Sequence, residues 1–215
     1  MIRILISSFD GGLDLTQYER AQFLPKSELN KIQRFKNWED AQLSLLGKLL
    51  LINGLCKHGG NKEILKELKL TAYNKPYLEN GPEFNLSHSG KYVICAISDQ
   101  TKVGVDVEKI ENINLDDFQN QWSTDEWKTI SGNPEPVNQF YKFWTRKEAL
   151  IKADGRGMSL SLPEIDVRFN MTAIEGKKWF FYEIVFDKQY VCHLVSENEN
   201  ENIERQMIFD LTTLL

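Results

Sequence analysis

Two acidic side chains stand two residues apart in an otherwise apolar, β-branched run, residues 103–110, which reads VGVDVEKI. A run of this kind predicts a β-strand. Side chains alternate faces along a strand, so Asp106 and Glu108 emerge on one side, whereas Val105 and Val107 face a core on the other. Two carboxylates this close raise each other's pKa unless a cation lies between them, and a hard divalent ion with oxygen ligands is the usual cation. The alternative is a solvated strand face with two unrelated acids.

A second chemically active group lies in a predicted helix over residues 140–153, whose apolar residues keep a helical spacing and are followed by an Asp-Gly stop signal. Glu148 and Lys152 are four residues apart and share one face of this helix, with Lys147 adjacent. An ammonium in this position can reach phosphate oxygens as a point charge. The alternative is an ordinary Glu–Lys helix pair, which contributes about a few tenths of a kcal/mol.

A third polar group is predicted between two strands in residues 84–97, which read FNLSHSGKYVICAI. The pattern predicts a short strand, a tight turn from Ser87 to Gly90, and a second, buried strand, so His88 lies at the turn. Ser87, Ser89 and Gly90 are small enough to let backbone N–H groups approach an anion. The alternative for a lone histidine in a polar turn is a surface residue without a ligand.

Together these three blocks resemble the 4′-phosphopantetheinyl transferases, in particular the long, two-lobed (Sfp-type) group that activates nonribosomal peptide synthetases. The matching segments are 85–90 (NLSHSG), 104–108 (GVDVE) and 144–152 (WTRKEALIK), with Lys75-Pro76 upstream and a Gly-x-Gly segment at 155–157 downstream. The resemblance extends from about residue 23 to about residue 162. It implies an α+β fold of two similar α/β lobes related by pseudo-twofold symmetry, with the active site in the cleft between them.

The resemblance also implies an activity, that of a holo-[acyl-carrier-protein] synthase. The 4′-phosphopantetheine group would move from coenzyme A to a serine hydroxyl of an apo acyl or peptidyl carrier protein, with Mg²⁺ (or Mn²⁺) as cofactor and 3′,5′-ADP as the other product. Asp106, Glu108 and Glu148 match the family's metal ligands. Glu148 also matches its proposed base, acting directly or through a metal-bound water, while Lys152 and His88 match groups that contact phosphate oxygens.

Three positions depart from the family's pattern for binding coenzyme A. Asn74 replaces the glycine of a Gly-Lys-Pro segment, although asparagine tolerates a left-handed backbone better than most residues. Glu28 stands where a basic residue is often found, and Leu43 where an arginine is common. We therefore expect loose recognition of the 3′-phosphate, unless Lys26, Arg34 or Lys48 replaces the missing charge. The positions that match coenzyme A contacts are Lys31, Ser44, Lys75, Pro76, Ser87, His88, Ser89, Asp106, Lys147 and Lys152.

The predicted macromolecular partner is a carrier protein, and Trp122 is the candidate contact with it, just before a helix start capped by Ser123 or Thr124. The alternative for a tryptophan here, packing in a core, applies more strongly to Trp127. Fatty-acid, polyketide and peptide-synthetase carriers present the same serine, so the pathway stays open. The formal net charge of −5 disfavours nucleic acid as a partner.

The length of 215 residues with 41% hydrophobic content suits two small lobes around a shared core. We predict a first domain over 1–100 with the nucleotide contacts, and a second over 101–215 with the metal ligands, the catalytic helix and the carrier contacts. Strands near 164–170, 178–186 and 190–196 are expected to close the second domain. Three cysteines indicate reduced thiols of a cytoplasmic protein, and no signal peptide or membrane span is predicted. A monomer is expected.

Two other functions fit parts of the pattern. One is a non-catalytic homologue that binds coenzyme A or a carrier domain, which the three departures would permit. The other is a Mg²⁺-dependent phosphoesterase acting on a nucleotide, which the three acids alone would permit. The second alternative lacks a second metal cluster or an evident histidine to activate water.

Overall fold

A computed structural model describes residues 1–9 and 20–208, apart from the side chains of Arg20 and Met158. The chain forms two compact units. One contains residues 1–100 together with the residues from 202 onward, and the other contains Thr101–Glu201. Of the described helices, none is long and apolar enough to cross a membrane.

The first unit is built on a four-stranded sheet in which β1 (Ile2–Ser8) occupies a central position. β1 pairs antiparallel with β5 (Tyr92–Ser98), which in turn pairs antiparallel with β4 (Glu83–Ser89). On its other side β1 pairs in parallel with β10 (Ile203–Ile208). The predicted boundary of the second domain at residue 215 therefore differs from the structure, in which β10 belongs to the first unit. β10 is placed there because it satisfies the backbone hydrogen bonds of β1.

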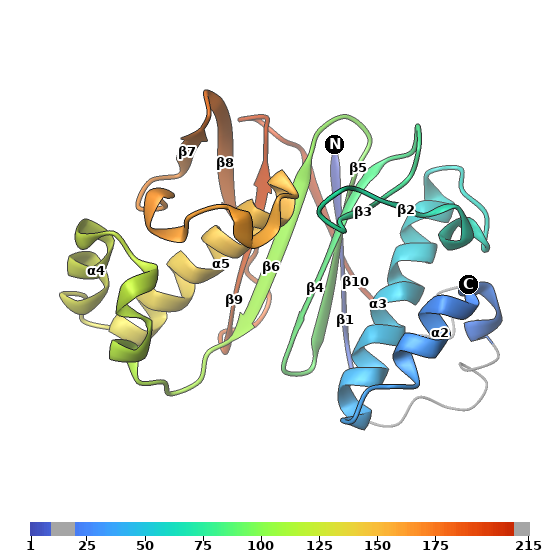
Figure 1. Cartoon of the computed structure of the whole chain (residues 1–215), viewed down its shortest axis with the longest axis horizontal. Coiled ribbons are helices and arrows are strands. Elements are labelled where there is room, and N and C mark those ends of the chain that lie inside the picture. The colour runs from blue at the N-terminus through green and yellow to red at the C-terminus, as the bar shows by residue number, and fades with distance from the viewer. Residues whose placement is uncertain (10–19, 209–215) are drawn as a thin grey trace. The chain divides into compact units, whose positions relative to one another are not determined.

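One long helix covers a face of this first sheet (Figure 1). This helix, α3 (Trp38–Lys57), begins at Asn37, whose side chain accepts from the backbone N–H of Glu39 at 2.8 Å. Leucines along α3 pack against inward-facing residues of β1, β4 and β5 to form the core of the unit. The remaining elements of the unit are α2 (Lys26–Ile32), the 3₁₀ helices η1 (Arg20–Phe23) and η2 (Ile64–Glu67), and the short strands β2 (Lys69–Leu70) and β3 (Pro76–Tyr77).

The second unit contains an antiparallel sheet in the order β6-β9-β8-β7, with the helix α5 (Pro136–Asp154) packed on one face (Figure 1). Proline at the first position of α5 starts the helix. Gly155 ends it in a left-handed conformation at φ 89°, with its N–H donating to the carbonyl of Ile151 at 2.9 Å. The other elements are β6 (Val103–Lys109), β7 (Met171–Ile174), β8 (Lys177–Glu183), β9 (Tyr190–Ser196), α4 (Thr124–Ser131) and the 3₁₀ helices η3 (Leu115–Gln121), η4 (Gly157–Ser159) and η5 (Leu162–Glu164).

The predicted strand near 164–170 is wrong. This segment begins in η5 and continues as a loop, and the strand starts only at Met171. The carboxylate of Asp166 accepts from the backbone N–H of Arg168 at 3.0 Å and also from its guanidinium. Such a local side-chain contact competes with the hydrogen bonds of a sheet.

The two units repeat one topology. In each, a first strand (β1 or β6) is followed by helices, then by an antiparallel hairpin whose last strand (β5 or β9) returns to pair with the first. The long helix, α3 or α5, packs on one face of the sheet in each case. The predicted α+β class with two similar lobes is therefore confirmed.

Cys56, Cys95 and Cys192 are free thiols, and burial raises the pKa of the Cys95 thiol.

Candidate functional site

Gly104 allows the backbone of α5 to lie directly against β6. A Cβ atom at this position would stand 2.0 Å from the carbonyl oxygen of Ala149 and 2.4 Å from the backbone nitrogen of Ala153. Any side chain would therefore push the helix away from the strand. Because side chains alternate along β6, Asp106 and Glu108 share the face of Gly104 and so point toward the helix side of the sheet.

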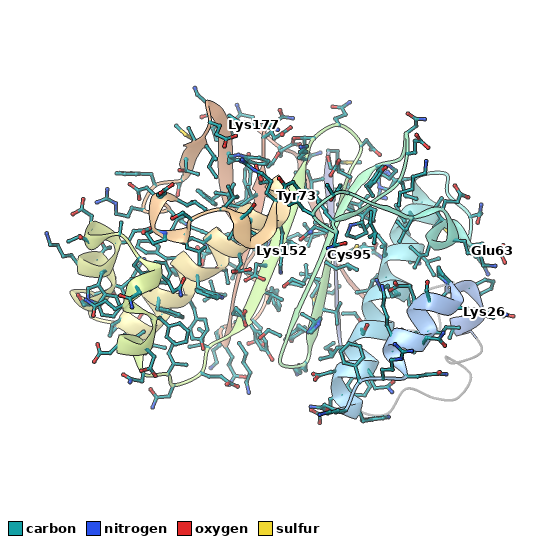
Figure 2. All side chains as sticks on the ribbon, in the orientation of Figure 1. Lys26, Glu63, Tyr73, Cys95, Lys152 and Lys177 are labelled. Atoms are coloured by element: carbon teal, nitrogen blue, oxygen red, sulfur yellow. The ribbon has the colours of Figure 1, made fainter. Side chains whose placement is uncertain are left out.

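Asp106 and Lys152 meet at this contact between strand and helix. The Nζ atom of Lys152 donates to Oδ1 of Asp106 at 2.6 Å. Figure 2 labels Lys152 on the ribbon of the chain. Asp106 is only 3% exposed, whereas the Lys152 side chain is 28% exposed. The structure thus brings together two residues that came from separate sequence blocks, with one carboxylate buried and an ammonium that still reaches solvent.

Glu148 lies one helical turn before Lys152 on the same face of α5. Burial raises the pKa of the Glu148 carboxyl, and the negative charge of Asp106 raises it further, while Lys152 opposes both effects. The two carboxylates are therefore close enough to interact. Glu108 is half-buried on the same strand face. It also lies near Tyr141 of α5. Burial raises the pKa of Tyr141, and the negative charge of Glu108 adds to this increase.

The donor chemistry of this group suits a hard divalent cation. Asp106, Glu108 and Glu148 offer only oxygen atoms, and burial together with the charge of Asp106 raises the pKa of Glu148, an effect that a bound cation would oppose. The acids do not form a closed cage in the structure, since in residues 1–9 and 20–208 no three His, Cys, Asp or Glu side chains are grouped as metal ligands. Lys152 instead provides the positive charge at Asp106.

Lys147 does not belong to this group, which contradicts its predicted contact with coenzyme A. Its side chain is fully buried, and its ammonium donates to Oε2 of Glu126 at 2.8 Å and to the carbonyl of Leu162 at 2.6 Å. It has no exposed surface with which to meet a phosphate. Residues 147 and 148 are separated by about 100° around the helix axis, so neighbours in sequence face different surroundings.

Trp122 is likewise internal, which contradicts its predicted contact with a carrier protein. It is 5% exposed and belongs to the core of the second unit. Its ring lies 5.4 Å from that of Phe140 and 6.3 Å from those of Phe143 and Trp144, measured between ring centroids. Trp122 therefore packs in a core, which was the alternative interpretation for a tryptophan at this position.

His193 was not predicted from the sequence as a site residue. It is a buried residue of β9 that lies opposite Asp106 in the sheet. The Nε atom of Arg146 donates to its Nε2 at 3.3 Å, so Nδ1 carries the proton and donates to Oγ1 of Thr145 at 2.7 Å. Burial, with the charges of Arg146 and Lys142, lowers its pKa to about 3 and keeps the ring neutral. The only sequence signal was a polar residue at an inward position of an apolar strand.

In the first unit, His88 lies on β4 and not in a turn, which corrects the predicted turn from 87 to 90. The ladder with β5 continues as far as the pair Ser89–Tyr92, and Gly90 makes the turn with φ 53°. His88 is exposed, whereas Ser87 is buried on the other face of the strand. Ser89 shares the face of Ser87. The three predicted polar residues therefore do not all point toward one surface.

The predicted turn before Lys75 and Pro76 is present despite its asparagine. Asn74 adopts φ 63°, and its N–H donates to the carbonyl of Thr71 at 3.0 Å, while Thr71 in turn donates to the carbonyl of Lys75 at 2.9 Å. Lys75 approaches Glu83 at 3.5 Å and is mostly buried, and Pro76 opens β3. Asn74 is therefore compatible with the left-handed backbone that this turn has.

Glu28 forms ion pairs with two lysines on the surface of the first unit. Lys31 contacts it at 2.6 Å and Lys48 at 3.0 Å. Burial acts to raise the pKa of Glu28, but the hydrogen bonds and charges of the two lysines outweigh it and lower the pKa overall. Ser44 lies one turn before Lys48 on α3, and Leu43 is buried in the core. Lys48 is thus the residue that joins Lys31 here, while Glu28 neutralises part of their charge.

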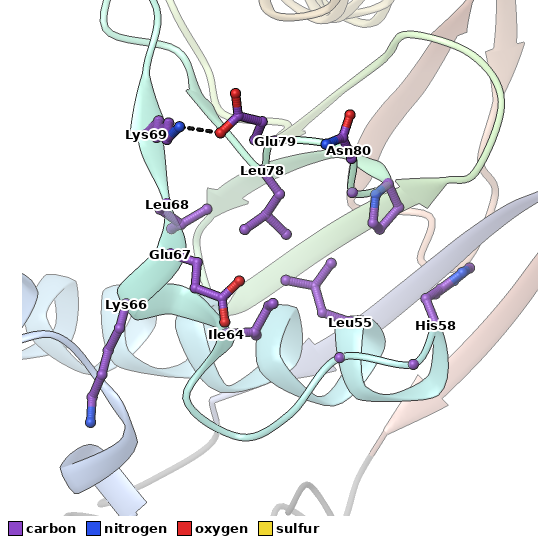
Figure 3. Close-up of a pocket in the computed structure, with 14 residues that line it drawn as sticks. Leu55, His58, Ile64, Lys66, Glu67, Leu68, Lys69, Leu78, Glu79 and Asn80 are labelled. Atoms are coloured by element: carbon purple, nitrogen blue, oxygen red, sulfur yellow. Dashed lines mark hydrogen bonds and ion pairs between the residues drawn. The ribbon is translucent and has the colours of Figure 1, made fainter.

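A cavity of about 680 Å³ lies elsewhere in the first unit, between the end of α3, η2 and the segment that follows β3. Leu55, Ile64 and Leu78 line it, and an ion pair between Lys69 and Glu79 crosses its rim (Figure 3). None of the site residues predicted from the sequence is among its described lining residues. We therefore do not assign this cavity to the candidate site.

Comparisons with known proteins agree with the sequence motifs. A family model described as "4'-phosphopantetheinyl transferase superfamily" matches residues 102–202, and one described as "4'-phosphopantetheinyl transferase, N-terminal" matches residues 15–100. The 4'-phosphopantetheinyl transferase Sfp of Bacillus subtilis (strain 168) is 32% identical over 166 residues, which cover 75% of this chain and 74% of that protein. The 4'-phosphopantetheinyl transferase gsp of Aneurinibacillus migulanus is 33% identical, covering 88% and 84%. A Xenopus laevis L-aminoadipate-semialdehyde dehydrogenase-phosphopantetheinyl transferase is 26% identical, covering 79% and 67%.

Proposed function

Because the chain belongs to the 4′-phosphopantetheinyl transferase superfamily, within its Sfp type, we propose that it transfers 4′-phosphopantetheine from coenzyme A to a serine hydroxyl of an apo acyl or peptidyl carrier protein. The other product is 3′,5′-ADP. The observation that carries the proposal is the contact between β6 and α5, where Asp106, Glu148 and Lys152 lie together. This is the grouping of acids and ammonium that a pyrophosphate substrate requires.

The proposed reaction forms a bond from the serine oxygen to the phosphorus of phosphopantetheine and breaks that phosphorus atom's bond to the bridging oxygen. The electron pair of the broken bond leaves with 3′,5′-ADP. Glu148 takes the serine proton, directly or through a water molecule. Burial and the charge of Asp106 raise its pKa in the metal-free protein, and a cation bound to Glu148 would oppose this increase and favour the route through water. Lys152 offsets the negative charge that develops on the leaving phosphate.

We propose that Asp106, Glu108 and Glu148 hold Mg²⁺, or Mn²⁺ in its place. The cation would neutralise the pyrophosphate oxygens of coenzyme A. Lys152 occupies Asp106 at 2.6 Å in the structure. We propose that Lys152 leaves this carboxylate and turns toward phosphate when coenzyme A binds, and its side chain is already partly exposed.

The residues proposed for the nucleotide part of coenzyme A belong to the first unit. Lys75 and Pro76 would contact the nucleotide, and His88, exposed on β4, would donate to a phosphate. Lys31 and Ser44 would contact the 3′-phosphate, together with Lys48. Ser87 and Ser89 remain proposed contacts through their backbone N–H groups. Trp122 and Lys147 are no longer included, because both are buried.

The direct test incubates an apo carrier domain with coenzyme A, Mg²⁺ and the protein. We expect the carrier to gain the mass of phosphopantetheine, and we expect Glu148→Ala to abolish this gain. Mass spectrometry of the intact carrier is the measurement. Coenzyme A binding without any mass gain would favour the non-catalytic homologue. Release of inorganic phosphate in the absence of carrier would instead favour the phosphoesterase.

A second prediction concerns the 3′-phosphate. Because Glu28 already pairs with Lys31 and Lys48, we expect coenzyme A to be preferred over 3′-dephospho-coenzyme A by less than about tenfold in kcat/KM, a difference of about 1.4 kcal/mol. Glu28→Gln releases both lysines and should increase the preference. Glu63→Gln, which removes the partner of Lys66 on the same unit, is the matched control. A preference of a hundredfold or more in the unmodified protein would contradict this prediction.

A further inference from the structure

The ammonium of Lys147 is held inside the second unit by three elements. Lys147 and Glu126 are both 0% exposed, and their Nζ and Oε2 atoms are 2.8 Å apart. Nζ also donates to the carbonyl of Leu162 at 2.6 Å and lies 4.9 Å from the centroid of the Trp122 ring. Lys147 thus connects the middle of α5 to α4, to η5 and to the end of η3.

The carboxylate of Glu126 also accepts hydrogen bonds from two other segments of the unit. Its Oε2 atom accepts from the backbone N–H and the hydroxyl of Ser123, each at 3.0 Å, which completes the N-terminal cap of α4. Its Oε1 atom accepts from the backbone N–H of Val167 at 3.2 Å. One buried carboxylate therefore links the start of α4, the loop before β7 and Lys147 of α5.

The two residues before Lys147 make directional contacts as well. Thr145 bonds to His193 of β9 at 2.7 Å, and Arg146 donates to the carbonyl of Val167 at 2.8 Å. Three successive residues cover about 200° around a helix axis. The turn immediately before Glu148 is thus fixed on several sides by hydrogen bonds, whereas the buried apolar side chains of α5 make contacts without directional preference.

A buried ion pair is a poor means of stabilising a fold, because removing two charges from water costs about as much as their attraction returns. Burial lowers the pKa of Lys147, and this effect exceeds the opposing effect of Glu126. What such a pair can provide is a specific geometry. Apolar residues of similar volume would fill the same space without fixing the rotation of α5.

We propose that Lys147 is a positioning residue, which fixes the rotation of α5 through Glu126 so that Glu148 and Lys152 face Asp106. The inference rests on the proposed function. Glu148 follows Lys147 by one residue, so any rotation of the helix moves its carboxylate directly. At about 6 Å from the helix axis, a rotation of about 10° displaces that carboxylate by about 1 Å, and a misplacement of this size can reduce catalysis about 100-fold.

The test uses the double variant Glu126→Gln/Lys147→Met, which conserves volume and leaves no buried charge. We expect kcat for carrier modification, per folded molecule at saturating substrate, to fall about 100-fold. We expect the Kd for coenzyme A, measured by calorimetry, to weaken by a much smaller factor than kcat falls. A kcat within threefold of the unmodified protein would overturn the proposal. A Kd weakened tenfold or more with kcat unchanged would also overturn it, since the variant would then impair binding and not the position of the catalytic groups.

Two further variants separate positioning from folding. Lys147→Met alone leaves the Glu126 charge buried without its ammonium, so it should melt at a lower temperature than the double variant. Ile130→Ala removes a fully buried apolar side chain of α4 from the same core. Ile130→Ala should lower the melting temperature while leaving kcat per folded molecule unchanged. An equal loss of kcat in Ile130→Ala would show that any loosening of the core has the same effect, and would overturn the proposal.

A crystal structure of the double variant provides a readout that does not depend on activity. We expect the contact between Lys152 Nζ and Asp106 Oδ1, 2.6 Å in the unmodified protein, to be lost. Retention of this contact at hydrogen-bond distance would overturn the positioning role even if the protein proved not to be a transferase. Absence of transfer by the unmodified protein would instead refute the proposed function alone.

Discussion

Replacing Glu148 by glutamine should reduce carrier modification by about 1,000-fold or more while the protein remains folded, because the variant loses both a proposed base and a proposed metal ligand. Glutamine keeps the size of the side chain, so the packing of α5 on β6 is preserved. The measurement is the initial rate of phosphopantetheine transfer, with circular dichroism as the check on folding. The matched control is Glu164→Gln, an exposed glutamate of the same unit, which should retain full activity.

The same variant should be more stable than the unmodified protein at neutral pH when metal is removed by a chelator. Burial and Asp106 raise the folded-state pKa of Glu148 above its unfolded value, so the folded protein binds this proton more tightly. Stability from this group is therefore greatest below the unfolded pKa and declines as the pH rises through the folded pKa. Glutamine has no charge to bury. A melting temperature that falls at pH 7, or a difference that does not shrink toward pH 4, would contradict this sign.

Replacing Gly104 by alanine should destabilise the second unit by more than about 3 kcal/mol and abolish transfer. The added Cβ would lie 2.0 Å from the carbonyl oxygen of Ala149 and 2.4 Å from the nitrogen of Ala153. Both are backbone atoms of α5, so the whole helix must shift, and Glu148 and Lys152 must shift with it. Urea unfolding gives the free energy of unfolding, and the transfer assay gives the functional loss.

Gly47→Ala is the matched control for this effect, since Gly47 also lies on a long helix that faces a sheet. There the new Cβ would meet only side-chain atoms, Cγ1 of Val93 at 3.4 Å and the two Cδ atoms of Leu86 at 3.9 Å. In a helix interior this change should be neutral or stabilising by up to about 1 kcal/mol. If Gly104→Ala unfolded at the same urea concentration as the unmodified protein, the close approach of α5 to β6 would be refuted.

The sequence was sufficient where local periodicity determines which side chains share a face. Alternation along a strand placed Asp106 on the same side as Glu108, and the four-residue helical spacing placed Glu148 above Lys152. The structure adds the contact of 2.6 Å that joins strand and helix. Asn74 was also predicted correctly as a residue able to adopt a left-handed backbone.

Environments set by residues distant in the sequence could not be predicted in this way. Lys147 seemed available to a phosphate because its partner, Glu126, lies 21 residues away and on another helix. The buried position of Trp122 depends on three rings of α5. The strand expected near 164–170 was lost to a contact between Asp166 and Arg168 that competes with sheet pairing. The pairing of β10 with β1 joins residues about 200 positions apart, for which no local pattern exists.

That pairing determines the order in which the protein can mature on the ribosome. The second unit is contiguous, so it can fold as soon as residue 201 has emerged. In the first unit β1 can pair with β5 earlier, but its other neighbour, β10, lies about 200 residues later in the chain. Until β10 has emerged, one edge of β1 exposes unsatisfied backbone groups, and an unpaired edge of this kind can pair with another chain.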